Sequence, residues 1–385
     1  MAFPHSPAEP GAEPSLAEQA RELADRVARP SAADRDRDRR WDPALFAELT
    51  GARPGLAGPL VPRGLGGGGL SATQTCALLQ GLGEGARDPG LALATTVHAV
   101  LATVPIRVFG RRWQQEHYLP RMASGQWLGA LSLHQTQGAA LATAVTVRPC
   151  EDAWLLDGEL DLVAGAPVAH HFLVVAAHRD GGGRTAFLVD RDTPGLRVEE
   201  TGPAAMPTCP WGRLVLDDCP VPYDAVLGTP HEAATEVEPL LAALDWVFSS
   251  APWLGLMRAL TREAVGAARE RRLFGRPLSH AQSARLTLAD LATRCELSGG
   301  LLYRAAEQFD SGGRPSHQDA AAARLFTAEA VRAVVDGAAR LSGPLVHTGD
   351  HLIERTHRDA LFFAGTGGGG DVLRPVIAAS LLGLG

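Results

Sequence analysis

The sequence predicts a mainly α protein in which a small antiparallel β domain lies between two helical domains. Three observations favour this fold class: apolar residues recur at helical spacing through the first third, short alternating runs fill residues 127–228, and long helical periods return from Val237. The 385 residues exceed the length at which one core usually stops growing, so several packed domains are expected. We place them at residues 1–126, 127–230 and 231–385.

The first domain is predicted to be helical throughout. Helices are expected over Leu16–Ala28 and Pro43–Leu49, and the charge run DRDRDRR at 34–40 between them is expected to be a solvated face or a turn. A glycine-rich loop, VPRGLGGGGL, follows at 61–70. Further apolar helical patterns cover 76–85, 89–109 and 112–123.

Short apolar runs separated by turn signals define the middle domain. The turn signals include Asp157-Gly158 and Pro194-Gly195. The runs are Val145–Val147, Trp154–Leu156, Phe172–Val175 and Leu214–Leu216. This pattern predicts a compact antiparallel sheet.

Long helices return in the last domain and predict a four-helix bundle, because short loops between long amphipathic helices make neighbours antiparallel. The spacing of Ser279 and Gln282 fits a capping box at the start of the second helix. The helices are expected over 237–271, 281–309, 318–341 and 350–364, with a last one from about 371.

Composition excludes several classes of function. The formal net charge of −7 argues against a nucleic-acid partner, which would require concentrated positive charge. No lysine occurs, so a lysine Schiff base and a phosphate-binding P-loop lysine are excluded. The N-terminus lacks the features of a secretory signal and no uninterrupted apolar run is long enough to span a bilayer, so a soluble, cytoplasmic protein is expected. The five scattered cysteines suit reduced thiols.

Several strings, in this order along the chain, resemble motifs of the acyl-CoA dehydrogenase family. In the first domain they are VPRGLGGGGLS and YLPRMASGQWLGALSL; in the last they are RERRLFGRPLSHAQ, ERTHRDAL, the Gly-Thr pair at 365–366 and DVLR. The middle domain adds Leu156-Asp157-Gly158, DTPG at 192–195 and VPYDAVLG ending at Gly228. The resemblance covers nearly the whole chain and implies an acyl-CoA dehydrogenase-like fold, an FAD cofactor, an acyl-CoA or carrier-bound thioester substrate, and a homodimer or homotetramer.

The resemblance implies that Arg271 and Phe274 reach across a subunit interface to FAD, with the guanidinium on the pyrophosphate and the ring beside the adenine. Arginine suits this role because it is always charged and donates paired hydrogen bonds to phosphate. A solvated arginine face with a core phenylalanine is the alternative. Gln282 is expected either beside the same half of the cofactor or as a helix cap. The resemblance also implies cofactor roles for Arg340 and Gly343 in AARLSG and for Thr366.

The expected catalytic base is missing from its usual place. Most family members carry a glutamate directly before the Gly-Thr pair, whereas this chain has Ala364, which cannot accept a proton. A minority place the acid on the first bundle helix, and matching the string Leu254–Met257 puts Asp245 there. A buried aspartate can serve as a base. The alternative is an ordinary polar helix residue.

The positions that face the flavin in the family also differ. His134-Gln135-Thr136 stands where the family has Thr-Glu-Pro, and Leu162-Val163-Ala164 stands where it has Trp-Ile-Thr or Trp-Ile-Ser. The resemblance implies that His134, Thr136 and Ala164 lie along the flavin ring, although Ala164 offers no hydroxyl. A strand-end histidine is the alternative for His134.

Three functions therefore stay open at this point. The first is FAD-dependent oxidation of an acyl thioester at its α,β bond. The second is a relative that has lost dehydrogenation and catalyses a redox-neutral step or acts as a scaffold in specialised metabolism. The third is a flavin-dependent oxygenase. A Rossmann site is set aside because neither glycine-rich run follows a strand, and a metal site is set aside because no acid or cysteine completes His347, His351 and His357.

Overall fold

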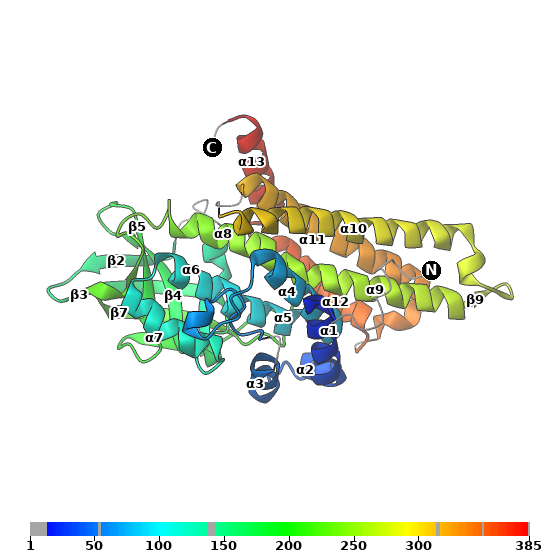
Figure 1. Cartoon of the computed structure of the whole chain (residues 1–385), viewed down its shortest axis with the longest axis horizontal. Helices are drawn as coiled ribbons and strands as arrows, with labels where there is room; N and C mark the ends of the chain where they lie inside the picture. Colours follow the sequence, from blue (N-terminus) through cyan, green and yellow to red (C-terminus); the bar gives the residue numbers. More distant parts are fainter. Residues whose placement is uncertain (1–13, 53–54, 138–142, 313–315, 349, 384–385) are drawn as a thin grey trace.

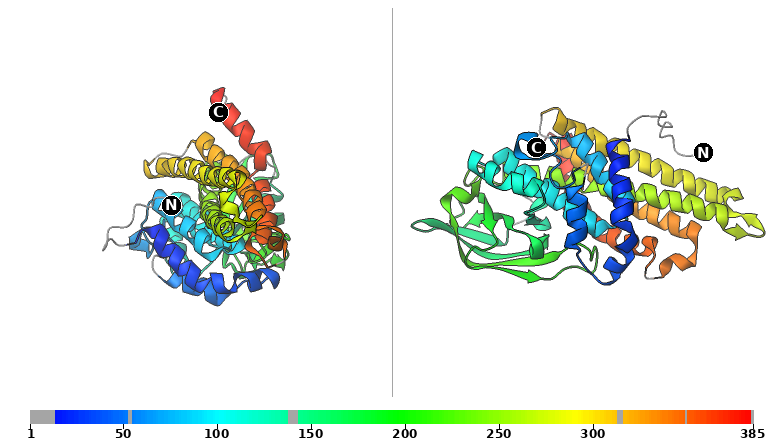
Figure 2. Two further views of the ribbon diagram at one scale, coloured as in Figure 1. Left: turned by 90° about the vertical axis from the view of Figure 1, so that its right-hand side faces the viewer. Right: turned by 60° about the horizontal axis from the view of Figure 1, so that its bottom comes forward.

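The structure is a computed structural model that describes residues 14–383 except 53–54, 138–142, 313–315 and 349. Figure 1 shows the sheet at one end of an elongated molecule, and long helices run from it to the opposite end. The N-terminal helices pack along one side of these long helices, as the two further views in Figure 2 also show. The predicted fold class is confirmed.

The N-terminal third is helical, as predicted. A capping box formed by Ser15 and Glu18 begins α1, and a second one formed by Ser71 and Gln74 begins α4. The helices are α1 (Leu16–Val27), α2 (Ala32–Arg37), α3 (Pro43–Gly51), α4 (Ala72–Ala86), α5 (Pro89–Thr96), a π-helical segment (Val97–Ala102), α6 (Thr103–Phe109) and α7 (Arg112–Ala123).

The sheet is mixed, so the prediction of a purely antiparallel sheet was wrong in part. Strands β1 and β2 lie between β3 and β4. Each pairs antiparallel with β3 and parallel with β4. The strand order is β6-β7-β3-β1-β4-β5-β8, with β2 beside β3 and β4, and the other named strand pairs are antiparallel. The strands are β1 (Gly129–Ser132), β2 (Val145–Pro149), β3 (Ala153–Ala164), β4 (His171–His178), β5 (Arg184–Asp190), β6 (Leu196–Glu200), β7 (Trp211–Pro222) and β8 (Val226–Leu227).

Long helices form the C-terminal part, where a short β9–β10 hairpin connects α9 to α10 and lies at the end of the molecule farthest from the sheet (Figure 1). The predicted capping box is absent, because Leu278–His280 forms a 3-10 turn and α10 begins at Gln282 after Ala281, without a side-chain cap. The elements are α8 (Val237–Phe248), α9 (Ser250–Glu270), β9 (Arg272–Leu273), β10 (Arg276–Pro277), α10 (Gln282–Asp310), α11 (His317–Ser342), α12 (Leu352–Gly365) and α13 (Gly369–Leu381).

Two glycines let α4 and α9 cross backbone to backbone. A Cβ atom on Gly83 would lie 2.0 Å from the Pro252 carbonyl oxygen, and one on Gly255 would lie 1.9 Å from that of Gln80. Both distances are much shorter than a van der Waals contact, so only glycine fits at either position. This close crossing fixes one wall of the cavity described below.

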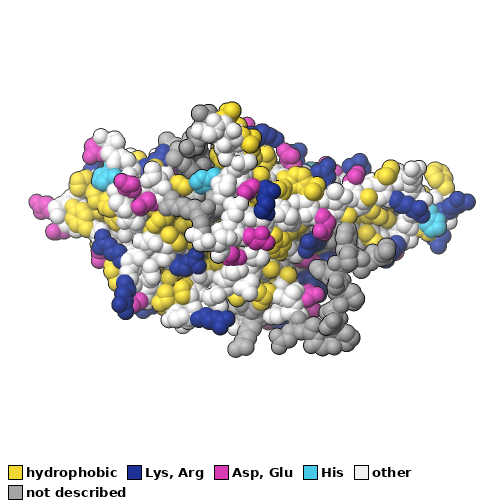
Figure 3. All heavy atoms as spheres, turned by 45° about the horizontal axis from the view of Figure 1, so that its top comes forward, with side chains coloured by type: hydrophobic (Ala, Val, Ile, Leu, Met, Phe, Trp, Pro, Cys, Tyr) yellow, Lys and Arg dark blue, Asp and Glu magenta, His cyan; other side chains and the backbone are white. Residues whose placement is uncertain are grey.

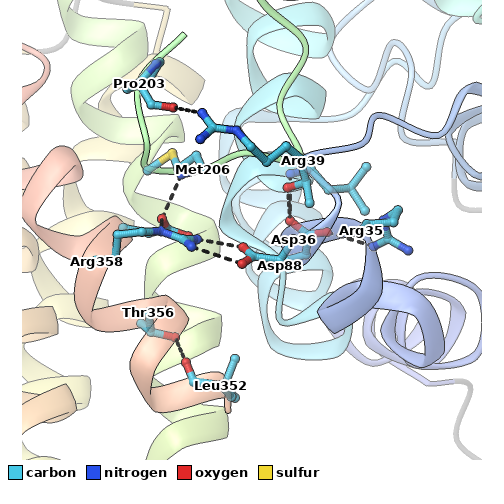
Figure 4. A network of polar contacts seen from close by, with 12 residues as sticks. Arg35, Asp36, Arg39, Asp88, Pro203, Met206, Leu352, Thr356 and Arg358 are labelled. Carbon is cyan, nitrogen blue, oxygen red and sulfur yellow. Dashed lines mark hydrogen bonds and ion pairs between the residues drawn. The ribbon is translucent and has the colours of Figure 1, made fainter. Parts of the chain in front are cut away.

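The sequence predicted that the charge run at 34–40 is a solvated face or a turn, but two of its residues are buried. It forms most of α2, and Arg35 and Asp36 point inward with exposures of 1% and 8%. Arg35 donates to Asp88 at 2.8 Å, and Arg358 of α12 donates to both oxygens of Asp36 at 2.7 and 3.0 Å (Figure 4). Buried charges need such partners, so these two ion pairs attach α2 to α5 and α12.

Two helical stretches are long and apolar enough to cross a membrane by length and composition. They are Pro89–Phe109 and Val237–Glu270, and the structure buries 83% and 100% of their apolar windows. They are core helices of the folded protein. The sequence analysis had expected no such stretch because it considered uninterrupted apolar runs only.

Asp359 provides a test of the buried network. Its side chain accepts from the Met206 N–H at 2.7 Å and from Arg358 Nε at 2.8 Å, yet burial raises its pKa from 3.8 to about 6. A raised pKa in the folded state stabilises the protein at low pH, and this contribution is lost as pH rises through about 6.

We expect the unfolding free energy of the wild type to fall, relative to Asp359→Asn, by on the order of 3 kcal/mol between about pH 4 and pH 7. Urea unfolding across this pH range measures the difference. Asp350→Asn, at an exposed aspartate, serves as the control. Parallel pH profiles for wild type and Asp359→Asn would contradict the assignment.

Candidate functional site

A cavity lies between the N-terminal helices, the bundle and the Gly-Thr segment. Most of its lining is apolar, and the rings of Trp253 and Phe363 stack against each other with centroids 4.7 Å apart. Its polar lining residues are Asp88, Thr96, Asp245, Ser249, Arg324 and Thr366. A largely apolar cavity with a few convergent polar groups is typical of a small-molecule site.

Asp245 contributes a buried carboxylate to this cavity from α8, with 2% exposure. Its Oδ1 accepts from the Ser249 hydroxyl at 2.6 Å, and its Oδ2 accepts from the Thr136 hydroxyl at 2.9 Å. Ser249 lies one helical turn after Asp245, so the helix itself positions this donor. Thr136 comes from the 3-10 turn Leu133–Thr136 directly after β1.

The Thr136 hydroxyl has a second acceptor, the Leu133 carbonyl, which is also 2.9 Å away. A hydroxyl has one proton and rotates to suit its partners. It can therefore donate to Asp245 while the carboxylate is ionised, and to Leu133 once Asp245 carries a proton of its own. The site accommodates both protonation states without movement of the backbone.

Arg324 of α11 lies in the same wall and is 1% exposed. Its Nη2 donates to the Phe363 carbonyl at 2.9 Å and to the Thr366 hydroxyl at 2.9 Å, and its guanidinium lies 3.6 Å from the centroid of the Phe363 ring. Burial lowers the pKa of Arg324 to about 10, and the charge of Asp245 opposes this shift. Arg324 is therefore still a cation at neutral pH.

Gly367 allows these two charged groups to approach each other. A Cβ atom there would lie 3.0 Å from Asp245 Oδ2 and 3.4 Å from Arg324 Nε, and the residue has a left-handed φ of +66°. Its carbonyl accepts from Trp246 Nε1 at 2.8 Å, which fastens the segment after α12 to α8. Gly367 thus packs beside Asp245 and Arg324.

A second group of predicted residues meets at the far end of the bundle. Arg271 ends α9 and donates to the carbonyls of Arg340 and Leu341, at 3.3 and 3.2 Å. A Cβ atom on Gly343 would lie 3.1 Å from the same guanidinium. The structure thus brings Arg271, Arg340 and Gly343 together.

Phe274 lies beyond this group, on the β9–β10 hairpin, where it is fully exposed with a left-handed φ of +48°. The alternative of a core phenylalanine is therefore wrong. In Figure 3 the end of the molecule formed by this hairpin gathers apolar, basic and histidine side chains. An aromatic ring held in open solvent by a strained backbone suggests a contact outside the chain.

The other predicted residues are distributed as follows. Gln282 and His134 are exposed. Ala164 is buried at the end of β3, opposite Leu131 of β1. Thr366 uses its hydroxyl to accept from Arg324, so the structure joins it to the Asp245 group.

Comparison with known proteins identifies the family. The N-terminal, middle and C-terminal domains of acyl-CoA dehydrogenase match residues 12–126, 134–219 and 248–382. The chain is 31% identical over 356 residues to a benzylmalonyl-CoA dehydrogenase of Aromatoleum aromaticum, covering 91% of this chain and 92% of that protein. The chain belongs to the acyl-CoA dehydrogenase family.

Two further relatives of this acyl-CoA dehydrogenase family member are informative. An L-prolyl-[peptidyl-carrier protein] dehydrogenase of Pseudomonas fluorescens is 28% identical, over 85% of this chain and 87% of that protein. The solved structure of the prolyl acyl carrier protein oxidase AnaB has a TM-score of 0.87 at 25% identity and covers 96% of this chain and 100% of that one.

The sequence predicts Asp245 as a base and Thr136 beside the flavin, and the structure brings these two residues together. Ser249 and Arg324 were not predicted. Ser249 could have been found from its spacing of four residues from Asp245, which puts both on one helix face. Arg324 gave no signal, because an arginine in the alanine-rich pattern of 318–341 is indistinguishable from a solvated one until α12 is placed beside it.

Gly367→Ala tests the packing around Asp245. The new methyl group would meet Oδ2 and the left-handed backbone would be strained, so we expect a loss of about 1–3 kcal/mol in unfolding free energy. Thermal or chemical unfolding measures it. Gly365→Ala is the matched control, because a Cβ atom there meets nothing within 4 Å. Equal stabilities of the two variants would be inconsistent with this packing.

Proposed function

We propose that this protein is an FAD-dependent acyl thioester dehydrogenase that oxidises the α,β bond of its substrate. The observation that carries the proposal is the carboxylate of Asp245, buried in the wall of an apolar cavity and held by two hydroxyl groups. Membership of the acyl-CoA dehydrogenase family supports the type of reaction.

The residues present fit FAD in two places. The Arg271 guanidinium and the exposed Phe274 ring offer a phosphate contact and a stacking surface at one end of the bundle. Thr136 contacts Asp245 of α8, and Ala164 pairs with Leu131 of β1, the strand before the turn that carries Thr136. The ring would be held there by backbone groups because Ala164 has no hydroxyl. When bound, FAD supplies the hydride acceptor that the chain itself lacks.

Asp245 is the proposed base. Its carboxylate removes the proton from the carbon next to the thioester carbonyl, and that proton comes to rest on Oδ2 when the Thr136 hydroxyl turns to the Leu133 carbonyl. Arg324 compensates the charge of the resting carboxylate. The apolar walls exclude water from the reacting carbons.

The substrate class is an acyl thioester. Named relatives act on both kinds of carrier, CoA in the benzylmalonyl-CoA dehydrogenase and a peptidyl carrier protein in the prolyl enzyme. For this chain we leave the carrier open and propose a homo-oligomer in the cytoplasm. We also retain the three proposed domains, with residues 1–126 and 231–385 enclosing the acyl group and residues 127–230 facing the flavin.

One observation favours a second candidate function. Ala364 is partly buried and carries no acid, so a chain that does not use Asp245 as a base would be limited to a redox-neutral step, a scaffold role or flavin-dependent oxygenation. Colour separates these functions: a protein that cannot be loaded with FAD would leave only the redox-neutral and scaffold roles.

Asp245→Asn is expected to keep FAD bound but to slow anaerobic bleaching of the flavin by acyl thioesters at least about 100-fold, because an amide cannot take the proton. Rapid-mixing absorbance measurements on the flavin-loaded protein provide the rate. Asp290→Asn, at an exposed aspartate of α10, is the control. Bleaching at the wild-type rate would remove Asp245 from the mechanism.

Arg271→Ala is expected to weaken FAD binding at least about 10-fold, because a charge-assisted contact to phosphate is lost. Titration of the flavin-free protein with FAD measures the affinity. Arg269→Ala changes an exposed arginine two residues earlier and should leave the affinity unchanged. Thermal unfolding of both variants checks that the fold survives. Unaltered affinity in Arg271→Ala would refute the proposed phosphate contact.

A further inference from the structure

Arg324 has a hydrogen-bond donor that the described part of the chain leaves unused. Its Nη2 is fully engaged by the segment at the end of α12, but its Nη1 is buried and has no partner among the described residues. The side chain lines the cavity. An unpaired donor on a buried cation costs free energy, so its retention in a cavity wall indicates that a ligand atom meets it.

The guanidinium is held in place before any ligand arrives. Two carbonyls and a hydroxyl of Phe363 and Thr366 accept from Nη2, and the Phe363 ring supports the guanidinium face at 3.6 Å. A planar group fixed in this way gives its remaining N–H bonds a set direction. Such preorganisation strengthens binding because little conformational entropy is lost when a ligand oxygen is bound.

The other charged groups of the cavity do not compete for this donor. Asp88 pairs with Arg35 at 2.8 Å and also accepts from the Leu91 N–H and the Thr208 hydroxyl. Asp245 has a hydroxyl donor on each oxygen. Both carboxylates thus have hydrogen-bond donors, whereas Nη1 of Arg324 has no acceptor among the described residues.

We propose that the cavity selects acyl thioesters whose acyl group carries an oxygen acceptor, a hydroxyl or a carboxylate, that binds Nη1 of Arg324. This rests on the proposed function, since it specifies the substrate class of the same site. A plain alkyl chain would leave the donor unpaired on binding. A site that must hydrogen-bond its substrate discriminates strongly against an analogue lacking the partner atom.

The test compares three acyl groups of equal chain length, butyryl, 3-hydroxybutyryl and succinyl, each as its CoA and its pantetheine thioester. Isothermal titration calorimetry on the flavin-loaded protein gives the dissociation constants. We expect 3-hydroxybutyryl or succinyl to bind at least about 10-fold more tightly than butyryl, the ratio for one charge-assisted hydrogen bond. Arg324→Met should abolish this preference, so that the dissociation constants of the three acyl groups differ from one another by no more than about threefold.

Arg332→Met is the matched control, because it makes the same change at an exposed arginine further along α11. Equal affinities of the three acyl groups in the wild type, no binding of any of them, or a preference that survives in Arg324→Met would overturn the proposal. The wild-type comparison decides even if Arg324→Met fails to fold. Because binding is measured and not turnover, selective binding without bleaching of the flavin would refute the dehydrogenase function and keep this subsite.

Discussion

The arrangement of the cavity depends on a buried carboxylate and a buried guanidinium that compensate each other. Asp245 and Arg324 are 2% and 1% exposed, and an isolated charge at that depth would be very costly. Asp245 accepts from the turn after β1 and from Ser249 at the end of α8, and Nη2 of Arg324 donates to the end of α12. Three parts of the chain that are remote in sequence therefore meet at one point, and the cavity takes its shape from that meeting.

The absence of an acid at position 364 is consistent with the charge balance of the cavity lining. Ala364 lies between Phe363 and Thr366, the two residues that accept from Arg324. With Asp88 neutralised by Arg35, the pair Asp245 and Arg324 leaves the charged lining of the cavity close to neutral. A second acid beside them would place two like charges in the same buried site. This charge balance favours Asp245 as the proposed base.

The sequence was sufficient for the fold class and it singled out Asp245, which the structure places in the cavity wall. Both predictions rest on local patterns: helical periods, alternating runs and a string that fixes the register on α8. It was insufficient where a side chain's partner comes from far along the chain. Arg35 and Asp36 look solvated within DRDRDRR until Asp88 and Arg358 are placed beside them. Arg324 is the same case in the site itself. Both errors concern contacts between residues far apart in the sequence, which leave no periodic signature.

The length of α9 separates Asp245 from Arg271, and this separation supports the proposed homo-oligomer. Asp245 precedes α9, and Arg271 follows its 21 residues, which extend about 30 Å at 1.5 Å per residue. The carboxylate and the arginine of one chain are thus held apart by a rigid helix. The β9–β10 hairpin, which carries the exposed Phe274, continues past that helix, away from the sheet (Figure 1). Under the proposed function, one chain would offer Asp245 to one cofactor and Arg271 to another, and this separation is the reason for proposing a homo-oligomer.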